Sequence, residues 1–152
     1  MNLQAEATQS ETASPPSPAP FAIRDGVATD IPFVFRSWLT SYRRSSFARG
    51  IRDRIYFANE HKAIERILRS CSIRVACINE DPEIILGYVV LGPSIVHYAF
   101  TKPAFRRMHI LTRLLPDGDL EYTHRTEDSD RVLARLPRLT YNPYLALGGR
   151  DG

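Results

Sequence analysis

The residue types that most often carry chemistry are few and scattered in this chain. The four histidines, none of them spaced like a metal-binding pair, are His61, His97, His109 and His124. Cys71 and Cys77 lack the C-x-x-C spacing of a redox or zinc pair. The chain has no G-x-S-x-G elbow, no Walker loop and no H-E-x-x-H helix. We therefore expect no metal site, and we expect any active residues to be brought together by the fold.

Arginine is the abundant residue type that can bind ligands through its charge. The 152 residues carry a net charge of +3, and the excess of bases lies within residues 36–74, at Arg36, Arg43, Arg44, Arg49, Arg52, Arg54, Lys62, Arg66, Arg69 and Arg74. A guanidinium suits bidentate contact with carboxylate or phosphate. The run is either a solvated helical face or a surface for an acidic substrate or protein partner. Nucleic acid is not expected, because no aromatic side chains interleave with these bases on strands.

Length and composition favour one α/β domain. Two cysteines exclude a disulfide framework and favour a reducing, cytoplasmic location. Residues 84–101 are uncharged over about the length of a membrane span. However, Gly92-Pro93 in their middle predicts a turn between two strands, so no membrane association is expected. Residues 1–20, rich in Pro, Ser and Ala, predict a disordered arm before a domain at 21–147 and a flexible tail at 148–152.

Hydrophobic periodicity predicts the elements that position the polar residues. Strands are expected at 21–24, 73–78, 84–91, 95–101, 120–124 and 139–147, the last interrupted by Pro143. Helices are expected from a cap at Thr29 or Asp30 to about Arg44, from after a 45–50 loop to Ser70, from Pro103 to Leu115, and over 130–136 with Ser129 as cap. The predicted order is β-α-α-β-β-β-α-β-α-β.

This order, together with the segment Tyr98-Ala-Phe-Thr-Lys-Pro-Ala-Phe-Arg-Arg-Met-His-Ile-Leu111, resembles the GNAT N-acetyltransferase superfamily. In that family the fourth strand leads into a loop written [QR]-x-x-G-x-[GA], which opens a helix. Arg106 takes the first motif position, whereas His109 and Leu111 replace its small residues. Residues 85–90 resemble the family's third strand and residues 34–39 its first helix. The resemblance implies a mixed, mostly antiparallel central sheet flanked by helices.

The resemblance also implies acetyl-CoA as cofactor. Main-chain groups at Ala99 and Thr101 would face the pantetheine arm. The diphosphate would lie on the loop formed by Arg106, Arg107, Met108, His109 and Ile110, since unpaired N–H groups at a helix start favour phosphate. Glycine in such a loop allows a close backbone approach, and His109 and Leu111 depart from this.

Two residues are predicted for proton transfer. Some family members place a general-base Glu where this chain has Ile95, and strand alternation puts His97 on the same face. Residues 129–137 lack the tyrosine that the family uses as general acid, so Tyr141, with Tyr144 nearby, is the expected replacement. The alternatives are a hydrogen-bonded structural histidine and a packing aromatic. Thr123-His124-Arg125 is a second polar cluster to which the same structural alternative applies.

Two classes of function follow. The first is an N-acetyltransferase that moves an acetyl group from acetyl-CoA to the amine of a small molecule or protein, with an acidic acceptor suiting the arginines. The second is a non-catalytic binding or interaction protein of the same fold with a degenerate cofactor loop, for example a bacteriophage accessory protein.

Overall fold

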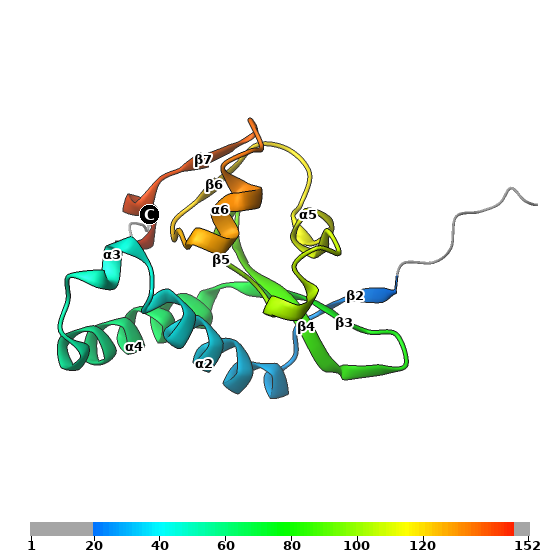
Figure 1. The fold of residues 1–152 in the computed structure, drawn as a ribbon, viewed down its shortest axis with the longest axis horizontal. Coiled ribbons are helices and arrows are strands. Elements are labelled where there is room, and N and C mark those ends of the chain that lie inside the picture. Colours follow the sequence, from blue (N-terminus) through cyan, green and yellow to red (C-terminus); the bar gives the residue numbers. More distant parts are fainter. Residues whose placement is uncertain (1–19, 148–152) are drawn as a thin grey trace, which may run out of the picture.

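A six-stranded sheet organises residues 20–147, the part of the chain that the computed structural model describes (Figure 1). Its strands, in spatial order, are β2 (Phe21–Asp25), β3 (Ser72–Ile78), β4 (Asp81–Gly92), β5 (Ile95–Thr101), β6 (Leu120–Tyr122) and β7 (Leu139–Tyr141). The strands from β2 to β5 pair antiparallel, whereas β5–β6 and β6–β7 are parallel. The expected mixed, mostly antiparallel sheet is therefore confirmed. The predicted arm, apart from Pro20, and the predicted tail lie outside the described residues.

Helices cover both faces of the sheet. They are α2 (Ile31–Tyr42), α3 (Ser46–Arg49), α4 (Asp53–Ser70), α5 (Ile110–Leu114) and α6 (Glu127–Leu133). One core packs α2 and α4 against Val75, Tyr88 and Tyr98, and the other packs α5 and α6 against Leu86 and Val89. Because β4 is buried on both faces, its sequence is nearly continuous in apolar residues, as in a central strand. Among the described residues no helix is long and apolar enough to cross a membrane.

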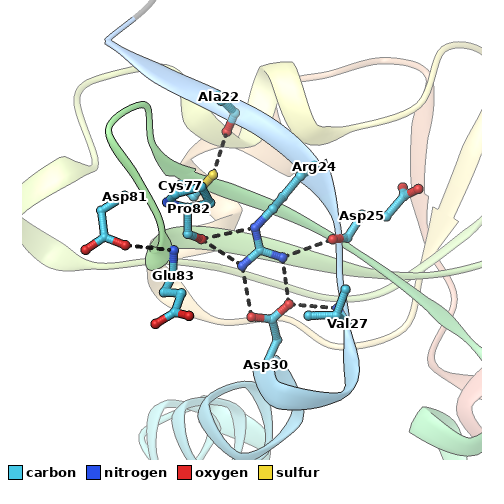
Figure 2. A network of polar contacts seen from close by, with 9 residues as sticks. All are labelled: Ala22, Arg24, Asp25, Val27, Asp30, Cys77, Asp81, Pro82 and Glu83. Atoms are coloured by element: carbon cyan, nitrogen blue, oxygen red, sulfur yellow. Dashed lines mark hydrogen bonds and ion pairs between the residues drawn. The ribbon is translucent and has the colours of Figure 1, made fainter.

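A polar network fixes the entry to α2 (Figure 2). The Arg24 guanidinium of β2 donates to both carboxylate oxygens of Asp30, at 2.7 and 2.9 Å, and also to the Pro82 carbonyl of β4. The Val27 N–H donates to the same Asp30 carboxylate at 2.8 Å. The hydrogen bond from Arg24 lowers the pKa of Asp30 and outweighs the effect of burial. One partly buried ion pair, with the bond from Arg24 to Pro82, thus joins β2, β4 and the residue that precedes α2.

Strand β5 contains an irregularity that sequence alternation does not predict. Val90 of β4 is opposite Tyr98 and Leu91 is opposite Val96, so His97 is an extra residue in β5. Such a β-bulge breaks the strict alternation of faces. Ile95 and His97 nevertheless lie on the same side, because a Cβ on Gly92 would be 3.7 Å from the Ile95 Cβ and 3.5 Å from His97 Nε2.

Several predicted boundaries are wrong for local reasons. β4 begins at Asp81 rather than at Ile84, because Asp81 pairs with Ile78 across a turn of only two residues. The expected 45–50 loop contains α3, which is capped by Ser45. The last strand ends at Tyr141, and Pro143 begins a 3-10 turn over Pro143–Leu147.

The two helices near the predicted cofactor loop also differ from expectation. α6 begins at Glu127, and its cap is Thr126, whose hydroxyl accepts from the Ser129 N–H at 3.0 Å. Ser129 is therefore the third residue of a capping box, with its own hydroxyl accepting from the Thr126 N–H. α5 begins only at Ile110, after a separate 3-10 turn over Pro103–Phe105.

Candidate functional site

The sheet is weakly joined where its parallel part begins. β5 and β6 pair only at Ile95–Glu121 and Val96–Tyr122, with one further backbone hydrogen bond from Thr123 N–H to the Val96 carbonyl at 3.1 Å. From Tyr98 to Thr101, the edge of β5 that faces β6 has no strand partner among the described residues. This leaves a length of β-strand edge available to a ligand.

A cavity of about 620 Å³ lies along this open edge. Residues 98–101 of β5 form part of its wall, and residues near the end of α2, in the loop after β5 and in the first turns of α6 form most of the rest. Leu111 of α5 completes the lining. Its volume is in the range of small-molecule and cofactor sites. The cavity is lined by five arginines and two acids, namely Arg44, Arg49, Arg106, Arg107, Arg131, Glu127 and Asp128.

The charges in this cavity are only partly neutralised. The Arg106 Nη2 atom lies 2.9 Å from the Asp128 Oδ2 atom, and the Arg106 Nε atom donates to the Thr101 carbonyl at 3.4 Å. The other four arginines form no ion pair with any residue that the structure describes. The cavity therefore carries excess positive charge and suits an anionic ligand.

Four of the residues predicted to bind the cofactor line this cavity. They are Ala99, Thr101, Arg106 and Arg107. Thr101 is 7% exposed, and its hydroxyl has no hydrogen-bond partner within residues 20–147. A buried hydroxyl without a partner is costly in a folded protein.

The other three residues predicted to bind the cofactor do not line the cavity. Met108 is partly buried against the core that contains α5, and Ile110 is buried in that core. His109 is exposed and precedes α5 with φ +58° and ψ +33°, a left-handed conformation. Glycine adopts this conformation without strain, and His109 occupies the position that matches the central glycine of the GNAT motif.

The two residues predicted for proton transfer also lie outside the cavity lining. His97 is buried, with its Nδ1 atom 3.1 Å from the Thr123 hydroxyl. Burial, with a smaller contribution from His124, lowers the pKa of His97 to about 4, so its ring is neutral at pH 7. The Tyr141 ring is 39% exposed and packs against the Tyr122 ring and the Arg125 guanidinium. The structure therefore does not bring His97 and Tyr141 together with the cavity residues.

A buried polar cluster beside the β5–β6 contact includes one residue that the sequence analysis missed. The Thr123 hydroxyl lies 2.7 Å from His124 Nδ1, and His124 Nε2 lies 3.6 Å from Glu60 Oε2. Glu60 is 8% exposed although it is a carboxylate. The sequence does carry a signal for it, because Glu60 stands between Tyr56 and Ile64 on the apolar stripe of α4.

The cavity also contains functional candidates that no motif identified. Arg44 and Arg49 were grouped with eight other bases, and of those ten only these two line the cavity. Arg131 and Glu127 come from α6, which was predicted to begin three residues later. These two residues lie beside β5 because the tertiary fold places α6 there, and local sequence patterns do not encode that placement.

Comparisons with known proteins add little to this picture. No protein-family model matches the chain, and a search of curated proteins gives no significant match. Among solved structures the chain is similar to the solution structure of apo-form YjaB from Escherichia coli, with 16% sequence identity and a TM-score of 0.47. The alignment covers 62% of this chain and 60% of that one, so the chain spans about three fifths of that protein's length.

Proposed function

We propose that the chain is a GNAT-like N-acetyltransferase that binds acetyl-CoA in the cavity beside β5 and transfers the acetyl group to an amine. The observation that supports this most is the unpaired edge of β5 opening onto an arginine-lined cavity. A strand edge offers N–H and C=O groups to the amides of a pantetheine arm, and arginines suit phosphate.

The residues that would hold the cofactor lie along one wall. Main-chain groups of Ala99 and Thr101 would bind the pantetheine arm, and Arg106 and Arg107 would bind phosphate. Arg131 adds a third guanidinium from α6. When bound, acetyl-CoA supplies the activated acetyl thioester. The protein would orient it and exclude competing nucleophiles.

Two groups are candidates for accepting the proton of the amine. His97 is neutral at pH 7, but it is buried, does not line the cavity and is hydrogen-bonded to Thr123. Glu127 lines the cavity and forms no ion pair within residues 20–147, whereas Asp128 is held by Arg106. The geometry therefore favours Glu127 over His97, and Glu127→Gln and His97→Gln variants test the two roles separately.

A second candidate function is supported by the position of the residues predicted for proton transfer. Because neither His97 nor Tyr141 lines the cavity, the same site could bind an anionic ligand without transferring a group. In this reading the chain is a binding protein in which the arginines provide affinity.

Calorimetry with acetyl-CoA, followed by a thiol-release assay with a panel of amines, tests both candidates. We expect saturable binding that Arg107→Ala weakens about tenfold, the usual effect of losing one charge-assisted hydrogen bond. Arg54→Ala removes the same charge from an exposed position outside the cavity and should leave the Kd unchanged. Binding with thiol release supports the transferase, and binding without release supports the binding protein. A wild-type titration without heat contradicts the acetyl-CoA site.

A further inference from the structure

The arginines of the cavity come from two separate parts of the fold. Arg106 and Arg107 follow β5, whereas Arg44 follows α2 and Arg49 ends α3. Figure 1 shows α3 and α5 on opposite sides of α6. A ligand in this cavity can therefore meet positive charge at two places. Arg106 and Arg107 would hold the phosphates of the cofactor. Arg44 and Arg49 are then free to bind a different anionic group.

The segment that carries Arg44 and Arg49 is held in place by their neighbours. The Arg43 guanidinium donates to the carbonyls of Ala48 and Ile51 and lies 2.7 Å from the Asp53 carboxylate. Ala48 is fully buried. The side chain of Arg43 thus holds the segment between α2 and α4 in place, and the side chains of Arg44 and Arg49 make none of these contacts.

Arg44 and Arg49 are left without acidic partners. Neither forms an ion pair with any residue in the part of the chain that the structure describes. Two serines of the same segment, Ser41 and Ser45, also line the cavity. The hydroxyls of both serines are already engaged, with Tyr98 and with the Ala48 N–H. The two uncompensated guanidinium groups themselves form a surface that suits a carboxylate or a phosphate monoester.

We propose that Arg44 and Arg49 bind an anionic group on the amine acceptor, so that the substrates are small amines carrying a carboxylate or a phosphate. This assignment rests on the proposed acetyltransferase function. The acceptor nitrogen forms a bond to the acetyl carbonyl carbon, and the carbon–sulfur bond breaks. The amine loses one proton to Glu127, which lines the same cavity, and the CoA thiolate takes up one proton. The two arginines hold the acceptor and take no part in these bond changes.

Matched acceptors and variants test this proposal in the full chain. The carboxylate arm compares γ-aminobutyrate with its amide, and the phosphate arm compares phosphoethanolamine with ethanolamine. In the wild type we expect the anionic member of at least one pair to have the higher kcat/KM. The Arg44→Ala, Arg49→Ala double variant should lower that kcat/KM about tenfold or more and leave the neutral amine within about twofold.

Calorimetry with CoA separates this proposal from the function on which it rests. The double variant should bind CoA with a Kd within about twofold of the wild type, and Arg54→Ala should change neither Kd nor acceptor preference. An equal loss of CoA affinity in the double variant would assign the two arginines to the cofactor and overturn the proposal. Equal kcat/KM values within both acceptor pairs of the wild type would also overturn it. A wild type that binds no CoA contradicts the acetyltransferase function itself.

Discussion

Arg106 and Asp128 form an ion pair between the loop after β5 and the first turn of α6, with 2.9 Å between Nη2 and Oδ2. Both residues line the cavity beside β5. The guanidinium that the family resemblance assigns to phosphate is therefore already engaged by a carboxylate. An anionic ligand must compete with Asp128 or bind beside it.

Replacement of Asp128 by Asn should strengthen acetyl-CoA binding. The change frees Arg106 and removes a negative charge from the cavity, and partly exposed pairs of this kind contribute up to about 1 kcal/mol, or about fivefold in Kd. The melting temperature should hardly change, because both side chains are at least one third exposed. Calorimetry measures the Kd, with Asp119→Asn as a charge-matched control outside the cavity. Weaker binding in Asp128→Asn would contradict the competition.

Replacement of His109 by Gly should raise the free energy of unfolding by about 1 kcal/mol. His109 has a φ of +58°, and a side chain other than glycine is strained in that region by about this amount. Urea denaturation measures the change. His109→Ala keeps a Cβ and should give no comparable gain, so an equal gain in both variants would show that the imidazole, rather than the backbone, is the source of strain.

The neutral state of His97 should make stability depend on pH. Its pKa is about 4 in the folded protein and near 6.5 when unfolded, so the unfolded chain binds more protons between these values. Its contribution is complete above about pH 6.5 and is lost as the pH falls towards 4, by at most about 3 kcal/mol. The difference in unfolding free energy between wild type and His97→Gln should shrink over this range. A constant difference from pH 7 to 4 would contradict a buried neutral imidazole.

The adjacent residues Arg43 and Arg44 should differ sharply when replaced by Ala. Arg43 donates to two backbone carbonyls and packs over the Tyr56 ring, so Arg43→Ala should reduce the free energy of unfolding by about 2 kcal/mol. Arg44 makes no such contact within residues 20–147, and Arg44→Ala should change stability by less than about 0.5 kcal/mol. Denaturant titration of both variants provides the measurement. Equal losses would mean that Arg43 does not hold the α2–α3 turn.

Gly87 of β4 should not tolerate a side chain. A Cβ at this position would lie 2.7 Å from the Phe100 carbonyl oxygen and 3.1 Å from the Ile110 Cγ2 atom. We expect Gly87→Ala to reduce the free energy of unfolding by about 1–3 kcal/mol, as over-packing does. Gly50→Ala is the control, because a Cβ there meets nothing within 4 Å. A neutral Gly87→Ala in thermal denaturation would contradict the close packing of β4 and β5.

The sequence predicted elements well where one signal dominated. The apolar run of β4 and the amphipathic stripe of α4 gave the strand and the helix, although β4 starts three residues before its expected position. Where two signals competed, the prediction was wrong. Both Thr126 and Ser129 can cap a helix, and only the reciprocal hydrogen bonds between them show that Thr126 is the cap.

The candidate site was harder to predict than the fold. The GNAT-like loop pointed to Arg106 and Arg107, which line the cavity, because that signal is contiguous in sequence. Glu60 and His124 come into contact because α4 packs against the chain after β6, and no local sequence pattern predicts this contact. The bulge at His97 was likewise not predictable, since alternation assumes an uninterrupted strand.

The short contact between β5 and β6 has a mechanical consequence. It divides the sheet into a large antiparallel half, from β2 to β5, and a small parallel half of β6 and β7. The cavity is lined from both halves, by β5 and the α2–α3 segment on one side and by α6 on the other. An occupant therefore contacts both halves beside the strand pairing that has the fewest residue pairs in the sheet. We expect occupancy to add contacts between the two halves, which are already joined by the sheet and by a shared apolar core.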